Sequence, residues 1–320
     1  MEEISKHYLP IDSILKGQDY QYRILKVLGE GTFGITYLAK AKVSVDGKLG
    51  HLYTEIDVAI KEFFMKEMNT RTGTAVDSGS QSGMFHSYRN KFRKEAMNLS
   101  RMQHAGIVKV LEVFEQNNTS YIVMEFMNGG SLDAYIRKKG KVAEDEALQL
   151  ISLVGNALEY MHDQRMLHLD LKPQNIMFNG QQQPVLIDFG LSKHYNDSGE
   201  PESSTSIGLG TPGYSPLEQA DYKEMKDFQP TLDIYALGAT RYKMLTGQTP
   251  PTASKVLNHP SLLNDKLLQA GISQKSRDLV LATMQPLKGG RPQTVAEFLT
   301  RIQTEPQAEE QIFKGNEVTT

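Results

Sequence analysis

The distribution of apolar and polar positions divides the chain into a strand-rich part and a helical part. Short runs rich in β-branched and aromatic residues recur in the first part, at 22–28, 35–40, 53–64, 107–115 and 120–126. Runs of this length and composition predict β-strands. The sequence QNNT between the last two runs is typical of a hairpin turn, and a polar loop is expected before residue 53.

Helical periodicity marks three further segments. In 147–161, apolar residues recur on one helical face, at Ala147, Ile151, Val154, Leu158 and Met161. The segment 232–245 is apolar on most sides and ends before Gly247, which predicts a buried central helix. A shorter helical stripe lies at 88–102. Between the long helices, 176–178 and 185–187 flank the sequence NGQQQ and predict a second small hairpin.

A change in composition at 127–130 (MNGG) predicts a hinge between two lobes. We expect an N-terminal extension at 1–19, a β-rich lobe at 20–126, a helical lobe at 127–303 and a polar tail at 304–320. The Ser/Thr/Gly-rich stretches at 66–83 and 196–209 are predicted to be loops.

Bulk composition describes an ordinary globular protein. The 320 residues are 39% hydrophobic and 23% charged, with a net charge of −3, so nothing indicates binding to nucleic acid or to an anionic membrane surface. The absence of cysteine excludes disulfides and thiolate chemistry. The acidic start of the chain does not resemble a secretory signal, and no apolar run reaches the roughly 18 residues of a membrane helix. We therefore expect a soluble, cytoplasmic protein.

The sequence GEGTFG (29–34) places three glycines between two predicted strands. A dinucleotide-binding fold would need a helix after the glycines, so this G-x-G-x-x-G sequence belongs to a hairpin instead. One interpretation is a tight turn that needs glycine for positive φ; the other is a flap whose backbone N–H groups approach phosphates. The glycines alone leave both open.

Lys61 and Glu95 are charged residues in apolar surroundings. Lys61 lies in the strand VAIKEFF, and Glu95 lies on the apolar stripe of Tyr88, Phe92, Leu99 and Met102. Because lone charges are costly to bury, an ion pair between Lys61 and Glu95 is expected. The alternative is two solvated side chains at the edge of an apolar face.

The sequence LHLDLKPQNIMF (167–178) crowds polar residues between apolar runs. Asp170 and Asn175 here, and Asp188 across the second hairpin, supply oxygen atoms that suit Mg²⁺ shared with phosphates. A turn or cap residue is the commoner role of any one of them. His168 is expected to be a buried residue bonded to backbone, because no other histidine has zinc-like spacing to it.

Together these motifs resemble those of the Ser/Thr protein kinases, and their amino-acid sequences are most similar to the bacterial branch of that family. The match runs in order over about 20–303: GEGTFG, VAIK (58–61), the hinge VMEFMNGGSL, HLDLKPQN (168–175), DFG (188–190), GTPGYSPLE (210–218) and DIYALG (233–238). Arg291 resembles that family's partner for Glu218. The resemblance implies an α+β, two-lobed kinase fold.

The resemblance also implies a role for each site residue. ATP would contact Gly29, Glu30, Gly31, Thr32, Phe33, Gly34, Thr36, Ala59, Lys61, Glu125, Met127 and Ser131. Lys61, Glu95, Asp170 and Lys172 would take part in catalysis. Asn175 and Asp188 would bind Mg²⁺, which Mn²⁺ could replace. The implied substrates are ATP and protein Ser/Thr hydroxyls, including those of the chain itself.

Five departures from the family pattern stand out. One is a polar insertion before the helix of Glu95, so that 34 residues separate Lys61 from Glu95. Thr36 replaces a valine over the adenine, Pro216-Leu217 precede Glu218 in place of Ala-Pro, and Ser131 stands where an acid often holds ribose. Leu169 replaces the arginine of His-Arg-Asp, so the cation that usually receives an activation-segment phosphate is missing. We therefore expect that activity does not require phosphorylation of 203–206, unless Lys193 or Arg89 takes over the phosphate.

Two other functions use similar motifs. A pseudokinase would use the fold as an ATP-binding scaffold, although the residues whose loss would indicate this are all present. A small-molecule kinase shares the Asp-x-x-x-x-Asn loop, but Lys172-Pro173 and GTPGYSPLE favour a platform for a polypeptide.

Overall fold

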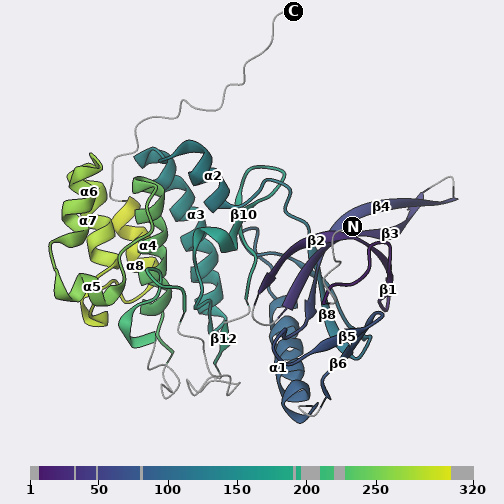
Figure 1. Cartoon of the computed structure of the whole chain (residues 1–320). Helices are drawn as coiled ribbons and strands as arrows, with labels where there is room; N and C mark the ends of the chain where they lie inside the picture. Colours follow the sequence, from purple (N-terminus) through teal and green to yellow (C-terminus); the bar gives the residue numbers. More distant parts are fainter. Residues whose placement is uncertain are drawn as a thin grey trace, which may run out of the picture.

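The chain folds into a β-rich lobe and a larger helical lobe (Figure 1). This computed structural model describes residues 7–31, 34–47, 50–79, 82–189, 192–195, 210–219 and 228–303. Among these residues, no helix is both long and apolar enough to cross a membrane. The two-lobed α+β fold predicted from the motifs is confirmed.

The smaller lobe is built on an antiparallel sheet whose strands lie in the order β1-β2-β3-β4-β8-β7. Its elements are β1 (Ile14–Lys16), β2 (Gln21–Gly31), β3 (Gly34–Gly47), β4 (Gly50–Phe63), β7 (Val110–Gln116), β8 (Thr119–Glu125) and helix α1 (Ser82–Ser100). Asn117 and Asn118 both adopt positive φ in the turn between β7 and β8, as the QNNT sequence predicted. The β1 strand shows that part of the expected N-terminal extension joins the sheet.

The expected polar loop before residue 53 is wrong. Strands β3 and β4 instead remain paired from Gly34↔Phe63 out to Gly47↔Gly50, and this long hairpin projects from the lobe (Figure 1). In the sequence, Val43 and Val45 alternate with polar residues, so this polar stretch has the period of a strand.

The expected loop at 66–83 is also wrong in part. It contains the hairpin β5 (Thr70–Thr72) and β6 (Ala75–Asp77), and α1 begins at Ser82. Val76 is buried, and its N–H donates to the carbonyl of Asn117 in the β7–β8 turn. The hairpin is thus part of the lobe. The stretch 196–209 and the tail 304–320 lie outside the described residues.

The larger lobe consists of helices and small two-stranded sheets. The helices are α2 (Leu132–Lys139), α3 (Glu144–Asp163), α4 (Thr231–Thr246), α5 (Ala253–Asn258), α6 (Leu262–Gln269), α7 (Gln274–Thr283) and α8 (Val295–Gln303). The short strands are β9 (Met166–Leu167), β10 (Ile176–Phe178), β11 (Pro184–Leu186) and β12 (Lys193–His194), and the 3₁₀ turns are η2 (Pro173–Asn175), η3 (Leu217–Gln219) and η4 (Lys288–Gly290). The predicted central helix is α4, which is buried along its length and ends at Gly247 with φ 71°. The predicted second hairpin is β10–β11.

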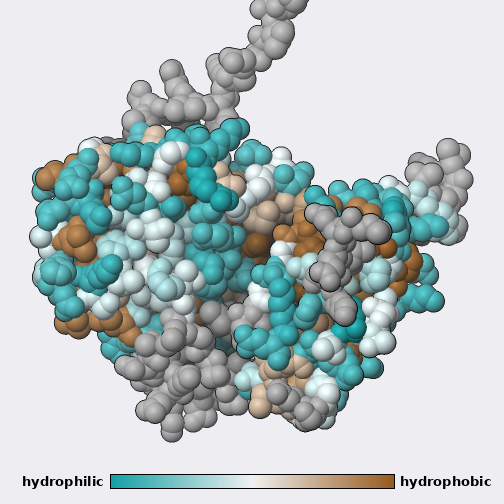
Figure 2. All heavy atoms as spheres, viewed as in Figure 1, coloured by the Kyte–Doolittle hydropathy of each residue, from teal (hydrophilic) through white to brown (hydrophobic). Residues whose placement is uncertain are grey.

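The hinge glycines are explained by a close approach to β10. A Cβ added at Gly129 would lie 2.6 Å from the Cβ of Phe178, and Gly130 has φ 78°. The N–H of Gly129 donates to the carbonyl of Phe178 at 2.9 Å, and the N–H of Phe178 donates to the carbonyl of Gly130 at 2.9 Å. These two hydrogen bonds hold the segment that connects the lobes against β10. Figure 2 shows hydrophobic residues gathered on the smaller lobe near the boundary with the larger one.

Candidate active site

The polar loop 168–175 is anchored by a buried carboxylate in the first turn of α4. Asp233 accepts the backbone N–H groups of His168 and Leu169, each at 2.8 Å, and lies 2.8 Å from His162 Nε2. Burial alone would raise the pKa of Asp233, but the hydrogen bonds from His162 and from the His168 backbone lower it below its usual value. The charged form of Asp233 therefore holds the loop in place.

Leu169 adopts an unusual backbone conformation, with φ 65°. Its N–H is held by Asp233, and its carbonyl accepts from Gln219 Nε2 at 2.7 Å. Its buried side chain packs in an apolar cluster with Leu167, Tyr195 and Leu232. The residue that replaces arginine is thus an apolar anchor of the loop.

His168 fills the interior beneath the loop, as expected. It is fully buried, and its Nδ1 accepts the N–H of Asp170 at 3.3 Å. Burial lowers the pKa of His168, so the neutral ring is favoured. Its ring lies 5.2 Å from that of Phe189, centroid to centroid, which links the loop to the segment containing Asp188.

Asp170 lies at the centre of a compact group of donors. Its Oδ1 accepts the Thr211 hydroxyl at 2.7 Å, and its Oδ2 accepts Lys172 Nζ at 2.8 Å. Lys172 also donates to Thr211 Oγ1 at 2.9 Å. Asn175 Nδ2 donates to the carbonyl and to Oδ2 of Asp170, at 2.8 and 3.0 Å. A hydroxyl, a cation and a carboxylate therefore meet at one point. This arrangement suits a carboxylate that accepts a proton from a short hydroxyl while a cation offsets negative charge.

The sheet brings the expected nucleotide contacts onto one face. Thr36 on β3 is the cross-strand partner of both Gly29 and Lys61, and Ala59 precedes Lys61 by two positions on β4. Because side chains alternate along a strand, these three side chains share a face. Lys61 Nζ lies 2.7 Å from Asp188 Oδ1 of the larger lobe. The ion pair joins the lobes across the site.

The predicted pair between Lys61 and Glu95 is wrong for this conformation. Within the described residues, Lys61 makes its ion pair with Asp188 and none with Glu95. Both side chains line one small cavity of about 30 Å³, together with Phe92 and Phe189. Burial raises the pKa of Glu95 to about 8, although the charge of Lys61 opposes the shift. The physical reason is that a protonated Glu95 can occupy its apolar surroundings without a cation.

The glycine-rich hairpin is open at two of its glycines. A Cβ added to Gly29 or Gly31 would meet no atom within 4 Å, and neither residue has positive φ. The tight-turn interpretation is therefore contradicted for these two positions. Gly34 differs, because its Cβ would lie 2.5 Å from the carbonyl oxygen of Glu62. Thr32 and Phe33 lie outside the described residues.

The hinge positions are placed beside the end of β8. The N–H of Glu125 donates to the carbonyl of Lys109 at 3.1 Å, and Met127, two residues further on, is buried. Ser131 Oγ accepts the N–H of Ala134 at 3.1 Å and caps α2. The observed contact of Ser131 is therefore structural, and its contact with ribose stays a prediction.

Asn175 and Asp188 fit a hard divalent cation by their chemistry. The amide nitrogen of Asn175 makes both contacts to Asp170, which leaves its carbonyl oxygen as the ligand atom. Asp188 presents a carboxylate, and Mg²⁺ commonly takes one or two carboxylates together with phosphate oxygens. Among the described residues, no group of three or more His, Cys, Asp or Glu side chains forms a metal-binding cluster.

The predicted pair of Glu218 and Arg291 is confirmed. Arg291 Nη1 lies 2.5 Å from Glu218 Oε1, and the guanidinium is buried over the ring of Tyr235, 5.0 Å from its centroid. Sequence reasoning missed the anchoring roles of Asp233 and Gln219. The signal for Asp233 was present, because an acid in an otherwise apolar helix needs buried donors.

The fold and this site combine two lobes, a glycine-rich hairpin, a strand lysine paired with Asp188 and a loop that carries Asp170. The family described as the protein kinase domain matches residues 22–302, so the chain belongs to that family.

Several relatives are serine/threonine-protein kinases. The chain is similar to serine/threonine-protein kinase PknA of Nostoc sp., with 30% identity over 77% of this chain and 42% of the relative. It is similar to serine/threonine-protein kinase B of Synechocystis sp., with 31% identity over 72% of this chain and 37% of the relative. It is also 27% identical to an Aurora kinase of Dictyostelium discoideum, over 81% of this chain and 59% of the relative. The chain thus spans well under two thirds of the length of these relatives.

Proposed function

We propose that the chain is an ATP-dependent protein serine/threonine kinase that transfers the γ-phosphoryl group to Ser or Thr hydroxyls, including its own. The observation that carries this proposal is the convergence of Thr211, Lys172 and Asn175 on Asp170, together with the ion pair of Lys61 and Asp188 that joins the lobes. The residues around Asp170 can orient an acceptor hydroxyl and accept its proton, and Lys61 and Asp188 can bind phosphates and a cation.

Lys61 would contact the α- and β-phosphates from the face it shares with Thr36 and Ala59. To do so it would exchange its ion pair with Asp188 for phosphate oxygens. Asp188 and Asn175 would then hold Mg²⁺ against the phosphates. When bound, Mg²⁺ supplies positive charge that offsets the charge developing on the transferred group.

Asp170 would orient the acceptor hydroxyl and accept its proton. In this structure Oδ1 of Asp170 accepts the hydroxyl of Thr211. An acceptor serine or threonine would present the same group to the same oxygen, so the observed contact supports a site for a short aliphatic hydroxyl. Lys172, 2.8 Å from Oδ2, would offset negative charge as the phosphoryl group arrives.

The hinge and the large lobe would supply the remaining contacts. The backbone of Glu125 and Met127 would bond adenine, and the open glycines Gly29 and Gly31 would let backbone approach phosphate. The proposed lobe boundaries are 20–126 and 127–303. With these boundaries the nucleotide would lie where the two lobes meet.

The test is phosphoryl transfer from labelled ATP with Mg²⁺ to generic protein substrates, followed by phosphoamino acid analysis. We expect Lys61→Met, Asp170→Asn and Asp188→Ala each to lower turnover by at least about 100-fold while the fold is retained. Lys40→Met is the matched control, because Lys40 on β3 forms a partly exposed pair with Asp57 at 2.8 Å and is not among the proposed site residues.

Three results would contradict the proposal in different ways. Wild-type-like turnover in one of these variants would refute the role of that residue. Phosphotyrosine as the main product would refute the Ser/Thr specificity. ATP binding by the wild-type protein without any transfer would favour the binding scaffold.

A further inference from the structure

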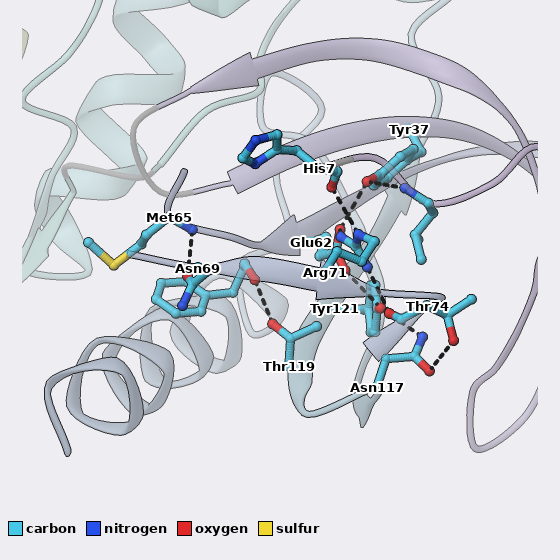
Figure 3. A network of polar contacts seen from close by, with 12 residues as sticks. His7, Tyr37, Glu62, Met65, Asn69, Arg71, Thr74, Asn117, Thr119 and Tyr121 are labelled. Atoms are coloured by element: carbon cyan, nitrogen blue, oxygen red, sulfur yellow. Dashed lines mark hydrogen bonds and ion pairs between the residues drawn. The ribbon is translucent and has the colours of Figure 1, made fainter. Parts of the chain in front are cut away.

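The N-terminal segment and the 66–79 insertion are joined to the sheet by a buried ion pair (Figure 3). Arg71 Nη2 of the insertion lies 2.5 Å from Glu62 Oε2 on β4, and the two side chains are 2% and 0% exposed. The hydroxyls of Tyr37 and Tyr121 each donate to the same carboxylate at 2.9 Å. Glu62 is therefore fully enclosed by donors.

Arg71 also holds two backbone segments in place. Its Nε donates to the carbonyl of His7 at 2.9 Å, and its Nη1 donates to the carbonyl of Thr74 at 2.7 Å. The N–H of Leu9 donates to the Tyr37 hydroxyl at 3.1 Å. One guanidinium thus fixes the N-terminal segment, the insertion and the sheet relative to one another.

Two side chains next to these fixed points meet at the glycine-rich hairpin. The hydroxyl of Tyr8 donates to Glu30 Oε2 at 2.8 Å. Lys66, at the start of the insertion, forms an ion pair with Glu30 Oε1. The contact with Lys66, and after it the bond from Tyr8, lowers the pKa of Glu30, so that its carboxylate is charged at neutral pH. Glu30 itself lies between the open glycines Gly29 and Gly31.

A carboxylate at this position raises an electrostatic difficulty. If the hairpin covers ATP, Glu30 lies in the element nearest to a triphosphate of several negative charges, and an unneutralised carboxylate would repel it. Lys66 offsets the charge of Glu30, and Tyr8 satisfies its second oxygen. Both donors hold the side chain toward the insertion and the N-terminal segment.

We propose that Lys66 and Tyr8 are positioning residues for nucleotide binding, which neutralise Glu30 and hold the glycine-rich hairpin in a conformation that accepts the triphosphate. This inference rests on the proposed use of ATP. It assigns to the insertion and the N-terminal segment a role in ATP affinity.

The size of the effect follows from exposure. The side chains of Lys66 and Glu30 are 41% and 38% exposed, so solvent screens the pair. Exposed pairs have small effects, and we expect a change of about two- to fivefold in the affinity for MgATP. The change should shrink toward onefold at about 0.5 M salt, where screening is strong over a few ångströms.

The experiment measures the Kd of MgATP by calorimetry, and KM and kcat for ATP, at low and high salt. The variants are Lys66→Met, Lys66→Arg, Tyr8→Phe, Glu30→Gln and the double variant Lys66→Met/Glu30→Gln. Lys40→Met is the matched control, because Lys40 lies on β3 of the same lobe and also forms a partly exposed ion pair, its side chain being 30% exposed against 41% for Lys66. Circular dichroism checks that each variant is folded.

We expect Lys66→Met to raise Kd and KM about two- to fivefold at low salt with little change in kcat. Lys66→Arg keeps the positive charge and should bind MgATP with an affinity close to that of the wild-type protein. In the background of Glu30→Gln, the same Lys66→Met change should have little effect, because the charge that Lys66 offsets is gone. Tyr8→Phe should raise Kd in the same direction by a smaller factor.

The outcomes separate this inference from the proposed function. If Lys66→Met behaves like Lys40→Met, or if its effect persists in the background of Glu30→Gln, the inference is wrong while ATP binding stands. If the wild-type protein binds no MgATP, the proposed function fails first.

Discussion

The buried pair of Glu62 and Arg71 makes a strong prediction about stability. Replacing Arg71 with methionine keeps a long apolar side chain but removes the cation, so the Glu62 carboxylate keeps only the two tyrosine hydroxyls as donors. Removing one partner of a buried ion pair costs about 3 to 5 kcal/mol. The carbonyls of His7 and Thr74 also lose their donor. We expect Arg71→Met to lower the free energy of unfolding by this amount.

The loss should depend on pH. Burial raises the pKa of Glu62 above its ordinary value, and the charge of Arg71 is the largest influence that opposes this. A carboxyl whose pKa is raised in the folded state stabilises the fold most at low pH, and this contribution is lost as the pH rises through the folded pKa. Without Arg71 the pKa rises further, so the destabilisation should be larger at pH 8 than at pH 5.5.

Urea unfolding followed by far-UV circular dichroism measures both effects, and the absence of tryptophan makes this signal preferable to fluorescence. Arg93→Met is the matched control. Arg93 pairs with Glu115 at 2.7 Å in the same lobe, but both side chains are 42% exposed, so its loss should cost less than about 1 kcal/mol. If the two variants lose similar stability, or if the Arg71→Met loss is independent of pH, the electrostatic account of this pair is wrong.

Two further predictions concern activity. Because burial raises the pKa of Glu95 to about 8 and its charged form is the one that can pair with Lys61, kcat/KM for ATP should increase between pH 7 and pH 9. Glu95→Gln should remove this increase and reduce activity less than Lys61→Met does; an unchanged profile would refute the role of Glu95. Separately, replacing Ser203, Ser204, Thr205 and Ser206 with alanine should change initial rates by less than about tenfold, or 1.4 kcal/mol of barrier, after phosphatase treatment. A larger loss with ATP binding intact would show that another cation, such as Lys193, receives a phosphate there.

The main elements of the fold could be predicted because their periods are local properties of the sequence. Phe92 and Leu99 of the predicted stripe and the apolar segment around Leu237 are buried as expected, because one face of α1 and most faces of α4 are apolar. The residues gathered around Asp170 were also found from sequence, because an acid, a cation and an amide lie within six positions of one another. Polar composition misled at 66–83, where a hairpin is held by contacts with distant residues.

The contacts of charged residues were harder to predict than their positions. Lys61 was recognised as needing a partner, but two acids compete for it, and their sequence positions do not say which is nearer. Nothing in the sequence indicated that Arg71 has a buried partner. That partner, Glu62, follows Lys61 on β4, so its side chain points to the opposite face of the strand from Lys61. Pairing of this kind is decided by the folded backbone.

Leu169 illustrates how one substitution can remove a demand for charge. Its N–H and carbonyl are held by Asp233 and Gln219, and its side chain is enclosed by the apolar cluster that includes Tyr195. An arginine there would require a buried partner, whereas leucine is stabilised by the cluster itself. Tyr195 directly follows β12, so the same cluster joins the strand that follows Asp188 to the loop that carries Asp170. The position of Asp170 therefore rests on packing and backbone hydrogen bonds that need no added phosphate.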